Sequence, residues 1–134
     1  MKTSFNPKNN PRVIIIQKLY GKFFNDDEKL TFPKHRFKKF IKDTVSGTIE
    51  RNDLILEELN KNLGEEFALN KLDKLFQIIL KSATYEFLYK PNVSLKIIIK
   101  EYLNASNFFL EDGQTKYLNA LLDNIGKKLR SSNA

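Results

Sequence analysis

The chain has 134 residues, of which 41% are hydrophobic and 29% are charged, a composition that suits one globular domain with a hydrophobic core. It contains no cysteine, which excludes disulfides and thiolate metal sites. The N-terminal segment lacks the apolar stretch of a secretory signal, and no apolar run approaches the length of a membrane span. We therefore expect a single domain over residues 1–134, without membrane association.

The net charge of +7 is unevenly distributed along the chain. Residues 1–42 hold eleven lysines and arginines against three acids, a net of +8, whereas residues 43–134 carry a net of −1. Clustered cations favour a polyanion such as RNA, because binding releases counterions from its phosphates. Solubility of a lysine-rich chain explains the same charge, so composition leaves both interpretations open.

The apolar residues follow helical spacing, and all predicted elements are helices. The first helix begins at Asn10-Pro11, because asparagine can cap a helix and proline suits its first position. Its apolar stripe includes Val13, Ile16, Tyr20 and Phe23. A second helical stripe follows Pro33 and covers residues 37–49, and a third covers residues 54–63.

The next predicted helix covers residues 72–89, with Asn70 as its cap and Pro91 beyond its end. It is apolar nearly all round, which is typical of a central helix with neighbours on several sides. Ser94 can cap the following helix, and the last helix covers residues 113–129. These elements predict an all-α fold, a compact bundle of six to seven helices.

The sequence offers no catalytic constellation. His35 is the only histidine, and one histidine without cysteine cannot form a familiar zinc site. Adjacent acids point in different directions on a helix, and the five glycines are too dispersed for a phosphate-binding loop. We therefore expect no enzymatic activity, no metal and no cofactor.

The first helix offers candidate RNA-binding side chains. Basic groups such as Arg12 can neutralise phosphates, the amide of Gln17 can read a base edge, and an exposed Tyr20 can stack on an unpaired base. In the alternative interpretation Tyr20 belongs to the core and the basic residues only solvate the helix. Spacing alone does not decide between the two.

Two blocks of the sequence resemble the family of the transcription antitermination factor NusB. The segment RVIIIQKLY, residues 12–20, resembles the Q-x-L-Y of the family's first helix, and residues 72–130 resemble its central and last two helices. The specific matches in the second block are Tyr85, Glu86, Val93, Lys96, Ile99, Glu101, Lys116, Asn119, Leu122 and Asp123. The resemblance implies an all-helical fold of two packed helical subdomains and a cytoplasmic bacterial protein.

Members of this family bind the boxA element of ribosomal RNA transcripts together with NusE, a small-subunit ribosomal protein, and join an antitermination complex with RNA polymerase. By position, the resemblance assigns RNA contacts to Lys8, Arg12, Gln17 and Tyr20, with a second patch at Lys116 and Tyr117. It assigns the NusE surface to Tyr85 and Glu86, with Glu86 expected at the accessible border of the central helix. Whether the chain forms a homodimer is left open.

Two alternative functions come from the same sequence. Similar domains precede the catalytic domains of ribosomal RNA methyltransferases, but no glycine-rich cofactor-binding region follows before Ala134. The other alternative is a helical protein-interaction module with weakened RNA binding. It is suggested by residues 8–12, Lys-Asn-Asn-Pro-Arg, which stand where the family has several consecutive arginines, because lysine lacks the forked contacts of arginine.

Overall fold

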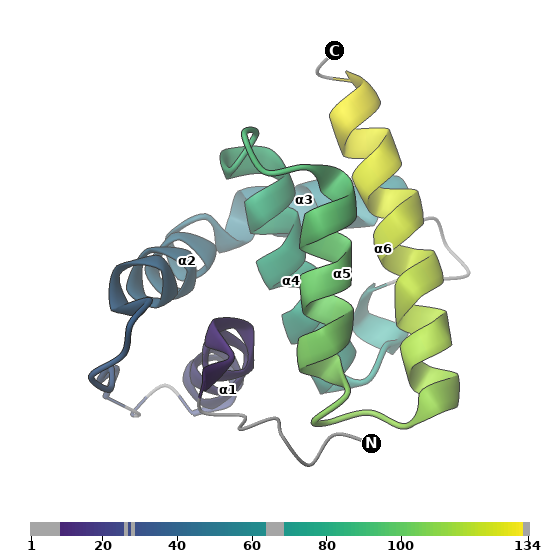
Figure 1. The fold of residues 1–134 in the computed structure, drawn as a ribbon. Coiled ribbons are helices and arrows are strands. Elements are labelled where there is room, and N and C mark those ends of the chain that lie inside the picture. Colours follow the sequence, from purple (N-terminus) through teal and green to yellow (C-terminus); the bar gives the residue numbers. More distant parts are fainter. Residues whose placement is uncertain (1–8, 26, 28, 64–68, 133–134) are drawn as a thin grey trace.

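The computed structural model describes residues 9–25, 27, 29–63 and 69–132, and within these ranges the chain forms helices and no strand. The elements are α1 (Pro11–Phe24), α2 (Lys38–Glu50), α3 (Asn52–Leu63), the short 3₁₀ helix η3 (Leu69–Lys71), α4 (Lys74–Tyr89), α5 (Leu95–Ser106) and α6 (Asp112–Ser132) (Figure 1). The predicted all-α fold is confirmed. Among the described residues, no helix is long and apolar enough to cross a membrane.

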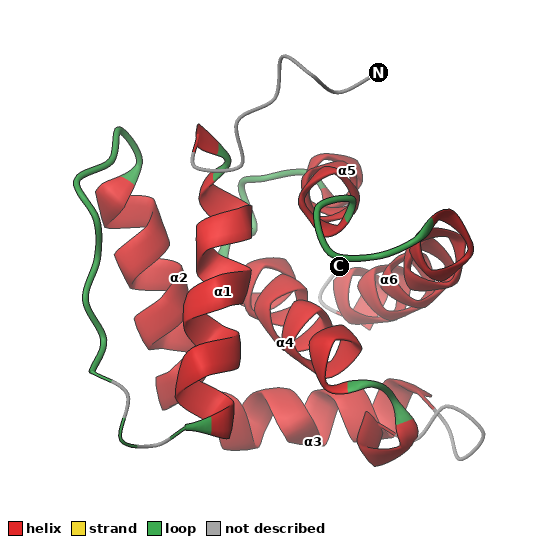
Figure 2. Ribbon diagram, turned by 90° about the horizontal axis from the view of Figure 1, so that it is seen from below, coloured by secondary structure: helices red, strands yellow, loops and turns green. Residues whose placement is uncertain are grey.

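Helix α4 is the centre of the fold and contacts each of the other five α-helices. Figure 2 shows α1 and α2 on one side of α4, α5 and α6 on the other, and α3 crossing near its end. The consecutive residues Ile78, Ile79 and Leu80 are all fully buried, although they point in three directions about the helix axis. The nearly all-round apolar pattern therefore predicted the central position of this helix correctly.

Side-chain caps begin three of the helices. Asn10 and Ser94 accept hydrogen bonds from backbone amides in the first turns of α1 and α5, as predicted. The cap of α4 is Asp73, which accepts a hydrogen bond from the Leu75 amide at 2.8 Å. The prediction of Asn70 was wrong, because Asn70 lies in η3 and the Asp73 carboxylate both caps the helix and complements its dipole.

Helices α1 and α2 begin at the same end of the molecule. Figure 2 shows the two helices side by side and pointing the same way. At their shared end the Arg12 guanidinium lies 4.9 Å from the centroid of the Phe40 ring. This places the start of α2 beside the start of α1.

Lys81 is a lysine in the otherwise apolar and hydroxyl-bearing middle of α4, with 8% of its surface exposed. Its ammonium lies 4.2 Å from the centroid of the Phe23 ring, and burial lowers the pKa of Lys81 below its ordinary value. The charged form is therefore less favourable in the folded protein than in the unfolded chain.

We expect Lys81→Met to raise the free energy of unfolding at neutral pH by about 1 kcal/mol, because methionine retains the packing without a desolvated charge. Folding lowers the pKa of Lys81, so the wild-type chain carries this cost below that lowered pKa and loses it as the pH rises toward 10.5. Urea unfolding across this range tests both points. If the difference in free energy of unfolding between Lys81→Met and wild type did not shrink as the pH rises, the desolvated charge of Lys81 would not be its cause.

Candidate nucleic-acid interface

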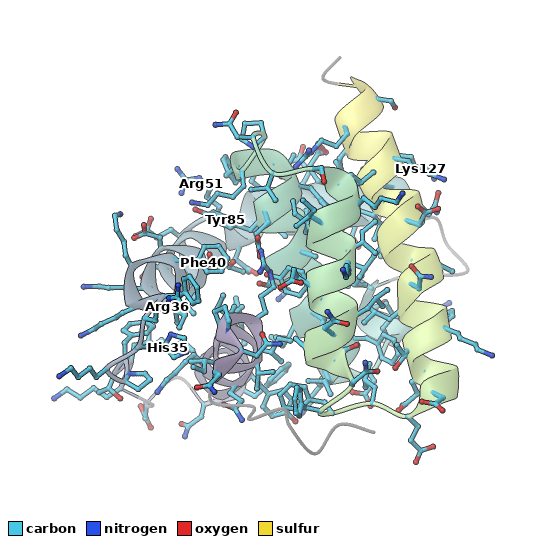
Figure 3. All side chains as sticks on the ribbon, in the orientation of Figure 1. His35, Arg36, Phe40, Arg51, Tyr85 and Lys127 are labelled. Atoms are coloured by element: carbon cyan, nitrogen blue, oxygen red, sulfur yellow. The ribbon has the colours of Figure 1, made fainter. Side chains whose placement is uncertain are left out.

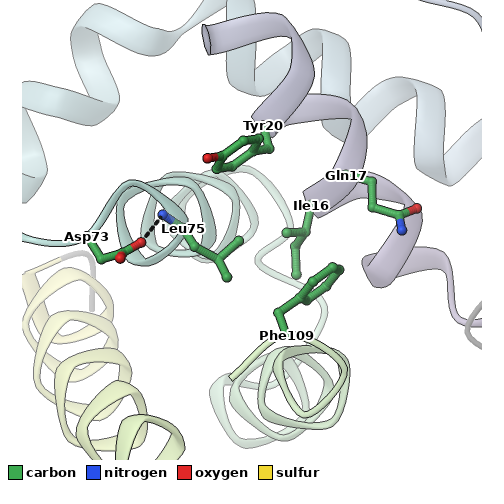
Figure 4. A pocket seen from close by; sticks show the side chains of 6 residues that line it. All are labelled: Ile16, Gln17, Tyr20, Asp73, Leu75 and Phe109. Carbon is green, nitrogen blue, oxygen red and sulfur yellow. Dashed lines mark hydrogen bonds between the residues drawn. The ribbon is translucent and has the colours of Figure 1, made fainter. Parts of the chain in front are cut away.

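A cleft of about 400 Å³ lies between α1, the start of α4 and the turn that joins α5 to α6. Its lining residues are Ile16, Gln17, Tyr20, Asp73, Leu75 and Phe109. Figure 4 shows the side chains of α1 on one side of the cleft and Phe109 on the opposite side. The cleft therefore combines aromatic rings with an amide, the groups that recognise an unpaired base.

Tyr20 is accessible at this cleft. Its side chain is 42% exposed, and Gln17, three residues earlier on the same face of α1, is exposed beside it. The Tyr20 ring packs at a tilt against Phe24, with their centroids 5.1 Å apart. The interpretation of Tyr20 as a core residue is therefore wrong, because its ring lies at the edge of the apolar stripe.

The second predicted patch adjoins the first. Lys116 and Tyr117 lie near the start of α6 and are exposed, and the Tyr117 ring meets Phe76 of α4 edge-on, at 5.7 Å between centroids. Phe76 follows Leu75, which lines the cleft. The first turn of α4 thus brings the two sequence-predicted patches to the same part of the molecule.

Arg12 lies elsewhere than predicted. Its side chain is buried and forms a two-pronged ion pair with Glu86 of α4, at 2.6 Å from Nη2 to Oε1 and 3.1 Å from Nε to Oε2. The guanidinium faces the core and already has a carboxylate partner, so the structure does not support the predicted RNA contact of Arg12. The other predicted basic contact, Lys8, lies outside the described residues.

Arg12 belongs to a buried polar cluster, which we call the Arg12 network: Arg12, Glu86, Tyr102 and Ser82. The Tyr102 hydroxyl donates to Glu86 and is hydrogen-bonded to Ser82. Burial, followed by the neighbouring Glu86, holds the pKa of Tyr102 well above its ordinary value. Burial alone would lower the pKa of Arg12, but Tyr102, Glu86 and Glu101 together raise it above its ordinary value, so the guanidinium remains charged.

The predicted NusE-contacting pair also lies inside the fold. Glu86 is completely buried, and Tyr85 is 7% exposed, with its ring filling the space that a side chain at Gly47 would need. Figure 3 shows Tyr85 beside α2. The expectation that Glu86 lies at an accessible border is wrong, because α1 and α5 cover this side of α4 and supply its partners Arg12 and Tyr102.

The sequence did not single out several residues that matter here. Phe109 could have been suspected, because a pair of phenylalanines just before a predicted helix is unusual in a turn, but its place opposite Tyr20 depends on the tertiary fold. Among the described residues, no group of three or more histidine, cysteine, aspartate or glutamate side chains could hold a metal ion.

Known proteins identify the family of this chain. A sequence profile of the NusB family matches residues 9–127. The chain belongs to the NusB family. The transcription antitermination protein NusB of Novosphingobium aromaticivorans is 33% identical over 91 residues, which cover 68% of this chain and 62% of that protein. The NusB of Rhizobium rhizogenes is 30% identical over 91 residues, 68% of this chain and 57% of that protein.

The chain aligns with less than two thirds of the length of these NusB relatives. A solved structure of T. maritima NusB has a TM-score of 0.74 to this fold and covers 91% of this chain and 92% of that chain, at 23% sequence identity. The family predicted from the two sequence blocks is therefore confirmed, and so is the fold. Both relatives are transcription antitermination proteins by name.

Proposed function

We propose that this chain is an RNA-binding antitermination factor that binds boxA RNA of ribosomal RNA transcripts together with NusE. The observation that carries the proposal is the exposed Tyr20 ring at the mouth of the cleft, next to Gln17 and opposite Phe109. An aromatic ring with a neighbouring amide and an apolar cleft can hold a splayed-out base by stacking and hydrogen bonding.

The two patches have complementary roles in this proposal. Gln17 and Tyr20 bind a base at the cleft, whereas Lys116 and Tyr117 hold the adjoining stretch of RNA beyond the first turn of α4. Lysine contributes a point charge toward phosphate, and the exposed part of Tyr117 offers a second stacking ring. Exposed tyrosine rings suit single-stranded RNA, whose unstacked bases are accessible to side chains.

Family membership supports the protein partners. We propose that NusE binds the chain together with boxA RNA and that the assembly acts with RNA polymerase. Tyr85 and Glu86 are not proposed as direct NusE contacts, because both side chains are buried against other helices. Addition of NusE is expected to tighten RNA binding, which titration of boxA RNA with and without NusE measures.

We expect Tyr20→Leu to weaken boxA RNA binding by roughly 1–3 kcal/mol, the usual contribution of one ring stacked on a base. Tyr20→Phe retains the ring and is expected to bind close to wild type. Fluorescence anisotropy with labelled boxA RNA measures the affinities. Because Tyr20 is exposed, melting curves of both variants are expected to match the wild type.

Equal binding by Tyr20→Leu and wild type would remove Tyr20 from the RNA-binding face. Equal losses in Tyr20→Leu and Tyr20→Phe would show that the hydroxyl, and not stacking, is responsible. If the wild-type chain bound no RNA even with NusE, the alternative of a helical protein-interaction module would replace the proposed function.

A further inference from the structure

Residues 34–42 form the most basic stretch of the described chain, with five lysines and arginines and no acid. We call Lys34, Arg36, Lys38, Lys39 and Lys42 the α2 basic patch. All five side chains are exposed. The patch lies outside the cleft and outside the Lys116–Tyr117 region, so the proposed RNA-binding face leaves it without a role.

Helix stability does not explain the α2 basic patch. Helix α2 starts at Lys38 with no acidic residue in its first turn and no side-chain cap, and the helix dipole repels cations at this end. Lys38 and Lys42 are four residues apart and share a helix face, where like charges repel. Of the five patch residues, Lys39 alone forms a salt bridge within the described part of the chain, with Asp43 at 2.8 Å. This charge arrangement costs folding stability, which is the expected price of a surface that serves binding.

The location of the patch relates it to the cleft. The start of α2 lies beside the start of α1, as the Arg12–Phe40 contact shows, and α1 lies between α2 and the helices α5 and α6 (Figure 2). Figure 3 shows His35 and Arg36 at the outer end of α2, on the side of the molecule opposite Lys127. The patch and the cleft thus flank α1 from its two sides.

Aromatic surface accompanies the charge. Phe37 is 44% exposed, and the Arg36 guanidinium lies 5.3 Å from the centroid of its ring. Cations interleaved with an exposed ring are typical of surfaces that follow single-stranded nucleic acid, where lysines meet phosphates and rings meet bases. An acidic protein partner would pair with the lysines as well, but it would gain less binding energy than RNA from contact with the exposed Phe37 ring.

We propose that the α2 basic patch is a second RNA-contacting surface, which binds the phosphates of single-stranded RNA that extends across α1 from the cleft. This inference rests on the proposed function. Eight residues of α1 separate Arg12 from Tyr20, an axial rise of about 12 Å. An RNA that occupies both surfaces therefore needs several nucleotides more than one that fills the cleft alone.

The test compares two lysine pairs with the same spacing. Lys38→Gln/Lys42→Gln removes two charges from the patch, and Lys96→Gln/Lys100→Gln removes two exposed charges four residues apart on α5. Each variant is titrated with boxA RNA of about 12 nucleotides and with a core of about six nucleotides, at several salt concentrations. Melting curves accompany the titrations, and the patch variant is expected to be at least as stable as wild type.

We expect the patch variant to flatten the salt dependence for the longer RNA by about 1.4 units in log K against log salt, from two lost phosphate contacts on a single strand. This corresponds to an affinity loss of about 25-fold at 0.1 M salt relative to 1 M. Binding of the short core is expected to stay near wild type, as is binding of both RNAs by the α5 variant.

Three results would overturn the inference while leaving the proposed function intact. They are wild-type binding of the longer RNA by the patch variant, equal losses in the two variants, and equal losses for the long and short RNA. Failure of the wild-type chain to bind either RNA, even with NusE, would instead contradict the proposed function itself.

Discussion

Replacement of Arg12 by alanine is expected to lower the free energy of unfolding by about 3–5 kcal/mol, the cost of leaving one partner of a buried ion pair alone. The Glu86 carboxylate would keep its bond from Tyr102 but lose both bonds from the guanidinium. Chemical denaturation monitored by circular dichroism measures the change.

A matched control is available in the same protein. The Lys39–Asp43 pair has a similar separation, 2.8 Å against 2.6 Å for Arg12–Glu86, but both of its side chains are largely exposed. We expect Lys39→Ala to leave stability nearly unchanged, since exposed ion pairs are screened by water and salt. A loss in Arg12→Ala no larger than in this control would show that the Arg12 network contributes little.

Substitution of Glu86, the ion-pair partner of Arg12, distinguishes a structural role of Glu86 from a role in binding NusE. If Glu86 lay on a partner surface, Glu86→Lys would spare stability. With Glu86 fully buried against Arg12, the same change sets two cations face to face in the core, and we expect the chain not to fold. Glu86→Gln keeps the shape of the side chain and serves as the milder variant. Its double mutant with Arg12→Ala is expected to lose less than the sum of the single losses.

The second large effect is expected at Arg130, near the end of α6. Its guanidinium donates three hydrogen bonds to backbone carbonyls, those of Phe87 at 2.9 Å, Val93 at 3.0 Å and Lys90 at 3.3 Å. These carbonyls belong to the last turn of α4 and the connection to α5, where helical partners run out. Arg130→Ala is expected to lower the free energy of unfolding by about 2–3 kcal/mol.

Arg130→Lys retains the charge but cannot reach three carbonyls at once, so we expect it to restore only part of the lost stability. Lys127→Ala, one turn earlier on α6, removes an exposed cation paired with Asp123 and is expected to change little. Arg130 belongs to the last turn of α6, and this end of α6 lies away from α1 (Figure 1). RNA affinity of the folded Arg130→Ala variant is therefore expected to match wild type. A loss in Lys127→Ala as large as in Arg130→Ala would argue for a general charge effect.

The helices were predictable because the apolar spacing that specifies each of them lies within its own stretch of sequence. Apolar spacing located the six α-helices of the described residues, and the apolar character of α4 on every side located the centre of the bundle. The exact cap of α4 was missed, because Asn70 and Asp73 are both good caps and only the path of η3 decides between them.

The environment of Arg12 and Glu86 was not predictable from charge alone, because the two residues are 74 positions apart. A signal was nevertheless present in the spacing. Arg12 lies four and seven residues before the buried Ile16 and Leu19, on the same helix face. On a helix without a polar face, a carboxylate such as Glu86 needs a buried cation as its partner.

Four of the predicted RNA-contacting side chains are accessible in the structure. Gln17, Tyr20, Lys116 and Tyr117 are exposed, as an RNA-binding role requires. Their convergence at the first turn of α4 was not predictable, since it depends on how α1 and α6 pack against a helix that lies between them in the sequence. Residue type indicated a candidate RNA-binding chemistry, and tertiary packing determined which of these side chains are accessible.

The position of α4 also governs how the molecule comes apart. Every other α-helix covers part of α4, so detachment of any one of them would uncover side chains such as Ile78, Ile79 or Leu80, which are fully buried in the native fold. Forms with one helix detached are therefore costly and sparsely populated, and opening of the α4 core requires global unfolding. A chain that unfolds so cooperatively forms few partly folded states that expose apolar surface and aggregate. Its abundance in the cell is then expected to follow its overall free energy of unfolding.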